Sequence, residues 1–253
     1  MFVACSTQCF GKHSLERALK VISELEFTKV DVAIHEKGPH LKPSAVAADP
    51  GRYAQKIRIG TSLCPVAFSV EIAAQGDEFL QQFRAVSRLA RLSTVPVISI
   101  PAATAGSGLD AEVSRLTTLV RLAEADGVML TVDTRTGTLT EMPATAVELC
   151  ERVPGLGLTL DPSHYIAGPN AGKNYDAVFA YVRHTRLRDT GRGPENFQVR
   201  VGQGEIEYGR VVSQLLRYRY DRGLSVDIRD IPDSPVAMEP EVRKLKYLLE
   251  SLV

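Results

Sequence analysis

The sequence predicts a single (β/α)₈ barrel of the TIM type, with one domain covering residues 1–253. Short β-branched runs alternate with longer segments of helical spacing, and eight such pairs follow one another without a linker or a change in composition. Repeated βα units require parallel strands, because each helix is the crossover to the next strand. Eight units in 253 residues favour closure into a barrel.

The alternative α/β architecture is an open, doubly wound sheet. That fold would carry a glycine-rich turn after its first strand. The segment STQCFG at residues 6–11 does not have this composition. The sequence therefore favours the barrel.

The first half of the chain contains four of the predicted strand–helix pairs. The clearest helical face has apolar residues at i, i+3, i+4, i+7 and i+10 from Leu15 and follows Ser14, a good N-cap residue. A helix break is expected at Asp49-Pro50, and the third strand is the least distinct because it contains a proline. The predicted elements are strand 2–6, helix 15–25, strand 29–34, helix 44–55, strand 61–68, a helix starting at residue 77, strand 97–100 and helix 110–125.

The second half repeats the pattern four times. Thr140 is expected to cap the helix that begins there, with Pro143 tolerated in its first turn. The predicted elements are strand 128–132, helix 140–152, strand 157–160, helix 175–181, strand 184–188, helix 208–220, strand 224–228 and helix 239–252.

The bulk composition narrows the class of function. Thirty basic residues balance thirty acidic ones, which gives no general electrostatic reason to bind nucleic acid or an anionic membrane. The chain contains no apolar run of membrane-spanning length, and its N-terminus does not have the pattern of a secretory signal. The four cysteines, at positions 5, 9, 64 and 150, are expected to be reduced core thiols, so a cytoplasmic location is expected.

Aspartates follow several of the predicted strands, at the end of a barrel where active sites form. Asp133, Asp161 and Asp227 end strands five, six and eight, and Asp189 follows strand seven. Each alone would serve equally well as a turn or cap residue. Three carboxylates at one level need a cation between them to stay ionised, and that cation is either a metal or an arginine.

Several segments of the chain resemble the sugar phosphate isomerase/epimerase family, the xylose-isomerase-like TIM barrels. The specific part lies between residues 128 and 228, and the strand VDVAI at 30–34 is similar but less distinctive. The segments that carry the resemblance are LDPSHY at 160–165, HTRLRDT at 184–190, GQGEIEY at 202–208 and SVD at 225–227.

The resemblance implies a divalent metal held by a Glu after strand five, an Asp after strand six, a His after strand seven and a Glu after strand eight. The two glutamates of the pattern move a proton on the substrate. Asp161 stands at the Asp position, and His164 and Arg192 stand at positions that contact substrate in the family. The chain departs at the other three ligand positions, which are Asp133, Arg186 and Asp227.

The exchange of His for Arg186 has the largest physical consequence. A guanidinium has no lone pair for a metal and keeps its proton at any working pH. Two alternatives follow: one divalent ion (Mn, Mg, Co or Zn) on Asp133, Asp161 and Asp227, or no metal, with Arg186 in its place and paired with at least two of these aspartates. His184, two residues earlier, is expected to point the same way one layer deeper in the barrel.

The resemblance favours a carbohydrate or sugar phosphate isomerase or epimerase. Asp133 and Asp227 would be base and acid beside a carbonyl, Asp161 would orient the cation, and Arg186 or His164 would stabilise the enolate oxygen. One alternative is a non-catalytic protein that binds a sugar or anion through Arg192 and His164. An endonuclease is less favoured, because the chain has five histidines and no net positive charge. The sequence leaves a homo-oligomer open.

Other residues near the strand ends carry weaker signals. His35 is a candidate substrate contact, with His40, Gln8 and Ser6 as further candidates for the pocket mouth. Arg188 is expected to pair with Asp189 or to point toward the helix layer. Among the remaining candidates, Arg135 adds to the positive charge on this face, His13 is expected at the surface, and the loop Gly106-Ser107-Gly108 has no phosphate-binding pattern.

Overall fold

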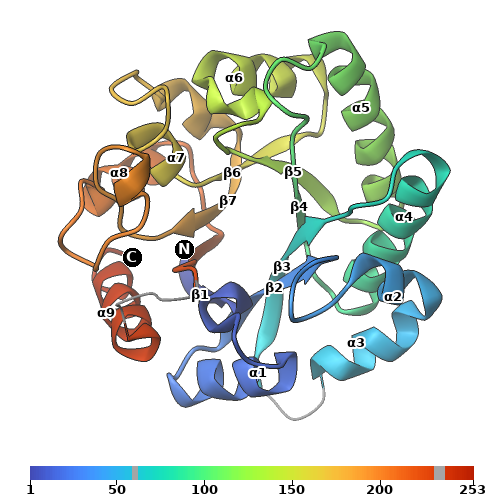
Figure 1. Cartoon of the computed structure of the whole chain (residues 1–253), viewed down its shortest axis with the longest axis horizontal. Coiled ribbons are helices and arrows are strands. Elements are labelled where there is room, and N and C mark those ends of the chain that lie inside the picture. Colours follow the sequence, from blue (N-terminus) through green and yellow to red (C-terminus); the bar gives the residue numbers. More distant parts are fainter. Residues whose placement is uncertain (59–61, 231–236) are drawn as a thin grey trace.

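The computed structural model describes residues 1–58, 62–230 and 237–253, and its strands form one closed parallel barrel in the order β1 to β8, with β8 paired to β1. Figure 1 looks down this barrel, with the helices arranged around the outside. The fold prediction is therefore confirmed. The strands are β1 (Phe2–Ser6), β2 (Lys29–His35), β3 (Cys64–Glu71), β4 (Val97–Pro101), β5 (Met129–Asp133), β6 (Gly157–Leu160), β7 (Val182–Leu187) and β8 (Gly223–Val226).

Helices connect the strands, and the hydrophobic core lies between them and the barrel wall. In the parts of the chain that the structure describes, none of the helices is long and apolar enough to cross a membrane. The α-helices are α1 (Leu15–Glu24), α2 (Pro43–Ala48), α3 (Pro50–Arg58), α4 (Gly76–Leu92), α5 (Leu109–Ala125), α6 (Pro143–Arg152), α7 (Ser163–Ile166), α8 (Tyr208–Arg217) and α9 (Met238–Glu250). The 3₁₀ helices are η1 (Thr7–Phe10), η2 (Leu139–Glu141), η3 (Asp176–Tyr181) and η4 (Pro194–Asn196).

The predicted break at Asp49-Pro50 separates α2 from α3. Asp49 has an extended φ of −158°, and Pro50 has no N–H with which to continue the first helix. The third strand was predicted too early. It runs from Cys64 to Glu71, because there it pairs with every residue of β2 from Lys29 to His35. The predicted start at residue 61 lies outside the described residues.

Two predicted helices differ in detail. Thr140 does not cap α6, which begins at Pro143 behind Met142. Instead, the Thr140 hydroxyl accepts from the backbone N–H of Arg135 and donates to the carbonyl of Asp133, so it fixes the turn that follows β5. The segment predicted as helix 175–181 is the 3₁₀ helix η3, a short crossover that packs on α6 and β6.

Side chains alternate between the two sides of each strand, and polar ones occupy part of the barrel interior. Thr131 and Thr159 share a hydrogen bond of 2.7 Å across β5 and β6. His184 of β7 is buried and lies 3.2 Å from Ser225 of β8, in the deeper layer where it was predicted. The polar side chains of the interior continue to the C-terminal ends of the strands, where the candidate site lies.

Candidate functional site

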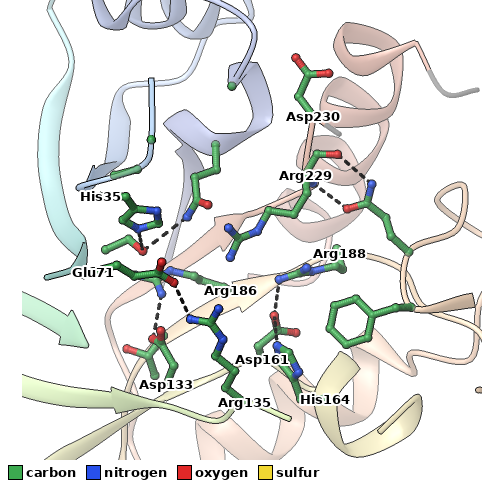
Figure 2. A pocket seen from close by; sticks show the side chains of 18 of the residues that line it. His35, Glu71, Asp133, Arg135, Asp161, His164, Arg186, Arg188, Arg229 and Asp230 are labelled. Atoms are coloured by element: carbon green, nitrogen blue, oxygen red, sulfur yellow. Dashed lines mark hydrogen bonds and ion pairs between the residues drawn. The ribbon is translucent and has the colours of Figure 1, made fainter. Parts of the chain in front are cut away.

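A cavity of about 720 Å³ opens at the C-terminal ends of the strands. Its wall is dominated by charged and imidazole side chains from six strands or the loops that follow them (Figure 2). The charged and imidazole residues closest to the strand ends are His35, Glu71, Asp133, Arg135, Asp161, His164, Arg186, Arg188 and Arg229.

Arg186 is the first of two buried arginines beneath this cavity. Its Nε lies 2.9 Å from Asp31 Oδ2, and its Nη1 lies 2.8 Å from Asp133 Oδ1. Burial raises the pKa of the Asp31 carboxyl, but Arg186 and His184, whose Nε2 is 3.0 Å away, outweigh it and hold that pKa well below its usual range. Burial lowers the pKa of Arg186, but the surrounding aspartates raise it above its ordinary value.

Arg188 is the second buried arginine, and the expectation that it pairs with Asp189 or faces the helices is wrong. Side chains two residues apart on a strand point to the same side, so residues 184, 186 and 188 of β7 and its extension share one face. Arg188 therefore also points into the barrel. Its Nη2 contacts Asp161 Oδ2 and lies 3.1 Å from Asp227 Oδ2. The ring of Phe197 covers the guanidinium at 5.1 Å.

These contacts correct the prediction that Arg186 pairs with at least two of Asp133, Asp161 and Asp227. Arg186 pairs with Asp133 and with Asp31, which was not predicted, whereas Arg188 pairs with Asp161 and Asp227. Two guanidinium groups thus serve four carboxylates. We call Asp31, Asp161, Arg186, Arg188 and Asp227 the buried ionic network, with each side chain at most 7% exposed.

Asp161 combines the two roles that the sequence left open. Its Oδ1 accepts hydrogen bonds from the backbone N–H and the hydroxyl of Ser163, as a capping residue does, and its Oδ2 faces Arg188. Burial raises its pKa, but Arg188, His164 and Ser163 together lower that pKa below the ordinary value. Asp161 therefore stays ionised.

Asp133 differs from the other aspartates because it lines the cavity with one oxygen unengaged. Both Arg186 Nη1 and the hydroxyl of Ser99 donate to Oδ1. Among the described residues, no hydrogen-bond donor reaches Oδ2, and the side chain is 16% exposed. Asp227, in contrast, is fully buried and is not part of the cavity wall.

Two histidines of the cavity wall are neutral near pH 7. Burial is the main cause that lowers the pKa of His35 and of His164 to about 4 each. His164 Nδ1 accepts a hydrogen bond from the backbone N–H of Thr136, so the proton of the neutral ring is assigned to Nε2. That Nε2 is 3.7 Å from Asp161, too far for a hydrogen bond, and His35 Nε2 is 3.0 Å from the Ser69 hydroxyl.

These two imidazoles make the protein sensitive to mild acid. Their folded-state pKa of about 4 lies below the usual 6.5, so the unfolded chain binds more protons between these values. Their contribution to stability is complete above pH 6.5 and is lost as the pH falls toward 4. From pH 7 to 5 we expect each to remove about 1–2 kcal/mol of unfolding free energy. Urea titrations across this range should show a shallower slope for His35→Asn and His164→Asn, and an unchanged slope for the exposed control His13→Asn.

The donor set does not fit the metal that the family pattern implies. Guanidinium groups lie between the carboxylates at its expected position, and they carry no lone pair. Within residues 1–58, 62–230 and 237–253, no group of three or more His, Cys, Asp and Glu side chains is arranged to hold an ion. No chemical step is therefore assigned to a metal here.

Several sequence candidates lie away from the cavity centre. Arg192 does not line the cavity, since its side chain is 82% exposed on the loop after β7 and pairs with Glu205 at 3.3 Å. Asp189 accepts from the backbone N–H groups of Gly202 and Gly204, so this carboxylate holds that loop in place. Gln8 and His40 line the cavity, whereas Ser6 is buried and caps η1.

The structure adds residues that sequence reasoning missed. Asp31 and Glu71 come from β2 and β3, Arg229 follows β8, and Phe197 lies in the loop after β7. The alternation of residues 184, 186 and 188 was a usable signal for Arg188. Asp31 was visible only as a charge inside the apolar strand VDVAI, a pattern that indicates a buried and paired carboxylate.

Comparisons with known proteins agree with this architecture. The structure is similar to that of a probable 3-DHS dehydratase from Bacillus anthracis, with 14% identity, 99% of each chain covered and a TM-score of 0.76. A xylose isomerase-like TIM barrel protein from Mycobacterium smegmatis, solved in complex with magnesium, has 16% identity, a TM-score of 0.75 and coverage of 99% of this chain and 97% of its own. An E. coli 3-keto-D-glucoside 4-epimerase has 14% identity, 99% of each chain covered and a TM-score of 0.73.

At these identities the structural likenesses show the fold alone. No curated protein matches the chain in sequence. A family model described as "xylose isomerase-like TIM barrel" does match, over residues 16–248. Because this match spans nearly the whole barrel, the chain belongs to the xylose isomerase-like TIM barrel family.

Proposed function

We propose that the protein is a metal-independent isomerase acting on a small carbohydrate, in which Asp133 moves a proton next to a carbonyl group. The observation that carries this proposal is the placement of Asp133. Its Oδ1 is held by Arg186 and Ser99, and its Oδ2 remains unengaged among the described residues at the cavity wall. A fixed carboxylate with one free oxygen is the arrangement that a general base needs.

In the proposed step, Asp133 Oδ2 takes the proton from the carbon beside the carbonyl. The electron pair of the broken C–H bond forms the C=C bond of an enediolate, and negative charge develops on the former carbonyl oxygen. His164 is the proposed donor to that oxygen, because Nε2–H lines the cavity and is not hydrogen-bonded to Asp161. The proton of the hydroxyl group on the deprotonated carbon passes to the adjacent, former carbonyl oxygen, and Asp133 returns its own proton to the former carbonyl carbon. The C=C electron pair forms the new C–H bond, and the carbonyl group now lies on the carbon that was deprotonated.

The partner acid expected from the sequence, Asp227, receives another role in this proposal. It is fully buried, and its Oδ2 is 3.1 Å from both Arg188 and Arg229. Asp227 therefore serves to position these two arginines and transfers no proton. Because the same carboxylate removes and returns the proton on one face of the substrate, the proposed step favours isomerisation over epimerisation, which needs a second group on the opposite face.

Arg186 takes the electrostatic part that the family pattern gives to a metal. It pairs with Asp31 and Asp133 and places a fixed positive charge beside the latter at the cavity wall. Because this cation is part of the chain, protein treated with a chelator is expected to retain its activity.

Proton exchange measured by ¹H NMR in D₂O tests the proposal on a panel of aldoses, ketoses and their phosphates. We expect the protein to exchange one α-proton of its substrate at the same rate after EDTA treatment and with added Mn²⁺. Asp133→Asn should slow exchange about 100-fold. Asp176→Asn, which alters a half-buried carboxylate on η3 outside the cavity wall, should not change it. Loss of exchange with EDTA, or full exchange by Asp133→Asn, would contradict the proposal.

A non-catalytic sugar-binding protein is the second candidate. It is favoured by the ion pairs that engage Asp31, Asp161 and Asp227, because a carboxylate oxygen that already faces a guanidinium is not free to take a proton from a substrate. Thermal stabilisation by a sugar without proton exchange in D₂O would support this candidate over the enzyme.

A further inference from the structure

We propose that Arg229 receives a carboxylate group of the ligand, so that the cavity takes a sugar acid in preference to a neutral sugar or a sugar phosphate. The inference deepens the proposed function by naming the substrate class, and it rests on that function only for the carbohydrate part of the ligand.

Arg229 is held at the cavity by its backbone. The Gln198 side chain donates to the Arg229 carbonyl at 2.9 Å and accepts from its N–H at 2.6 Å. This double hydrogen bond joins the loop after β7 to the residues after β8. Figure 2 shows the Arg229 guanidinium extending from this attachment toward the middle of the cavity, with His35 and Glu71 on one side and Arg188 on the other.

The charge of Arg229 acts on groups from three different strands. It contributes to the lowered pKa of His35, where burial is the larger cause. It also opposes the effect of burial on the carboxyl groups of Glu71 and Asp161, whose pKa values it helps to lower. His35 and Glu71 end β2 and β3, and Asp161 follows β6, so the Arg229 cation lies near the ends of three different strands.

The cavity arginines differ in how fully their charge is compensated. Arg186 and Arg188 each face two carboxylates, and Arg135 contacts Glu71. Arg229 faces Asp227 at 3.1 Å, and that carboxylate is already shared with Arg188. The Arg229 side chain is 36% exposed, so an entering ligand can contact it. Among the described arginines that line the cavity, it is the one whose positive charge is least balanced by carboxylates.

The chemistry of the ligand follows from this balance. A guanidinium binds a carboxylate through two parallel hydrogen bonds, and one added negative charge matches one undercompensated cation. A phosphate dianion would bring a second negative charge next to Asp133 and Glu71, which also line the cavity. Like charges in a partly buried site repel, so a monoanionic carboxylate fits better than a phosphate.

Isothermal titration calorimetry with matched probes tests this inference without requiring turnover. The probes are D-gluconate and D-ribonate, the corresponding neutral alditols D-glucitol and ribitol, and D-glucose 6-phosphate. We expect at least one aldonate to bind at least about tenfold more tightly than its alditol and than the phosphate ester. The preference should weaken as the salt concentration rises.

Three variants separate the contribution of Arg229 from general effects. Arg229→Gln should remove the preference for the aldonate, and Arg229→Lys should keep part of it, because the charge remains while the forked geometry is lost. Arg217→Gln, an exposed arginine on α8, should bind as the unaltered protein does. An unchanged preference in Arg229→Gln, tighter binding of the phosphate, or no binding of either aldonate would each overturn the inference. A binding preference without proton exchange in D₂O would instead overturn the proposed reaction alone.

Discussion

Replacing Arg186 with leucine is expected to lower the free energy of unfolding by about 3–5 kcal/mol. Arg186 is 3% exposed and pairs with both Asp31 and Asp133. Leucine removes the cation and leaves Asp31, which is fully buried, with His184 as its remaining ionisable partner. The cost comes from this uncompensated carboxylate more than from the lost contacts of the arginine itself.

Equilibrium unfolding in urea at pH 7 measures the effect. The double variant Arg186→Leu with Asp31→Asn is the informative control, because it removes the cation together with one of its carboxylates. We expect the double variant to be more stable than Arg186→Leu alone, which gives a coupling free energy of about 1–3 kcal/mol. A loss below about 1 kcal/mol for Arg186→Leu would mean that water reaches Asp31 and compensates it.

The barrel was predictable from the sequence because its signal is repeated eight times. An error in one unit leaves the others intact, and each crossover restricts its strands to the parallel arrangement. The misplaced third strand and the 3₁₀ helix η3 show where local signals fail. The register of β3 is set by pairing with β2, and η3 is a tight crossover whose apolar residues have the same spacing as those of an α-helix.

The site was predictable where a residue follows its own strand, and less so where its partner is distant. Asp133, Asp161 and Arg186 were placed correctly at the strand ends by the sequence pattern. One of the two partners of Arg186, however, is Asp31, 155 residues away in the chain. No local pattern reports such a pairing. A fully buried carboxylate in an apolar strand indicates only that a cation lies somewhere nearby.

The fold of the loop after β7 explains why Arg192, predicted as a substrate contact, lies outside the cavity. The family pattern fixes its distance along the chain from the strand-seven ligand position, but the loop that carries it is folded by Asp189. That carboxylate binds the N–H groups of Gly202 and Gly204, and a Cβ at Gly204 would lie 2.2 Å from Asp189 Oδ1. This folding directs Phe197 over Arg188 and leaves Arg192 in solvent.

Replacing Arg188 with methionine should destabilise the protein by about 3–5 kcal/mol at pH 7, and the loss should shrink as the pH falls. Without Arg188, Asp161 loses the cation that contributes most to lowering its pKa, so the pKa of this buried carboxyl rises in the folded state. A folded-state pKa raised above the unfolded value penalises the folded form at high pH and releases that penalty on protonation. Urea unfolding of the variant and the unaltered protein between pH 7 and pH 5 measures the difference.

Asp161→Asn in the Arg188→Met background identifies the source of this pH dependence. Asparagine removes the charge but keeps an oxygen for the Ser163 hydrogen bonds, so the double variant should recover part of the lost stability and lose most of the pH dependence. If Arg188→Met alone is equally destabilised at pH 7 and pH 5, its cost arises from packing against Phe197. The two buried arginines would then differ in kind: Arg186 would compensate charge, and Arg188 would serve chiefly to support the aromatic wall of the cavity.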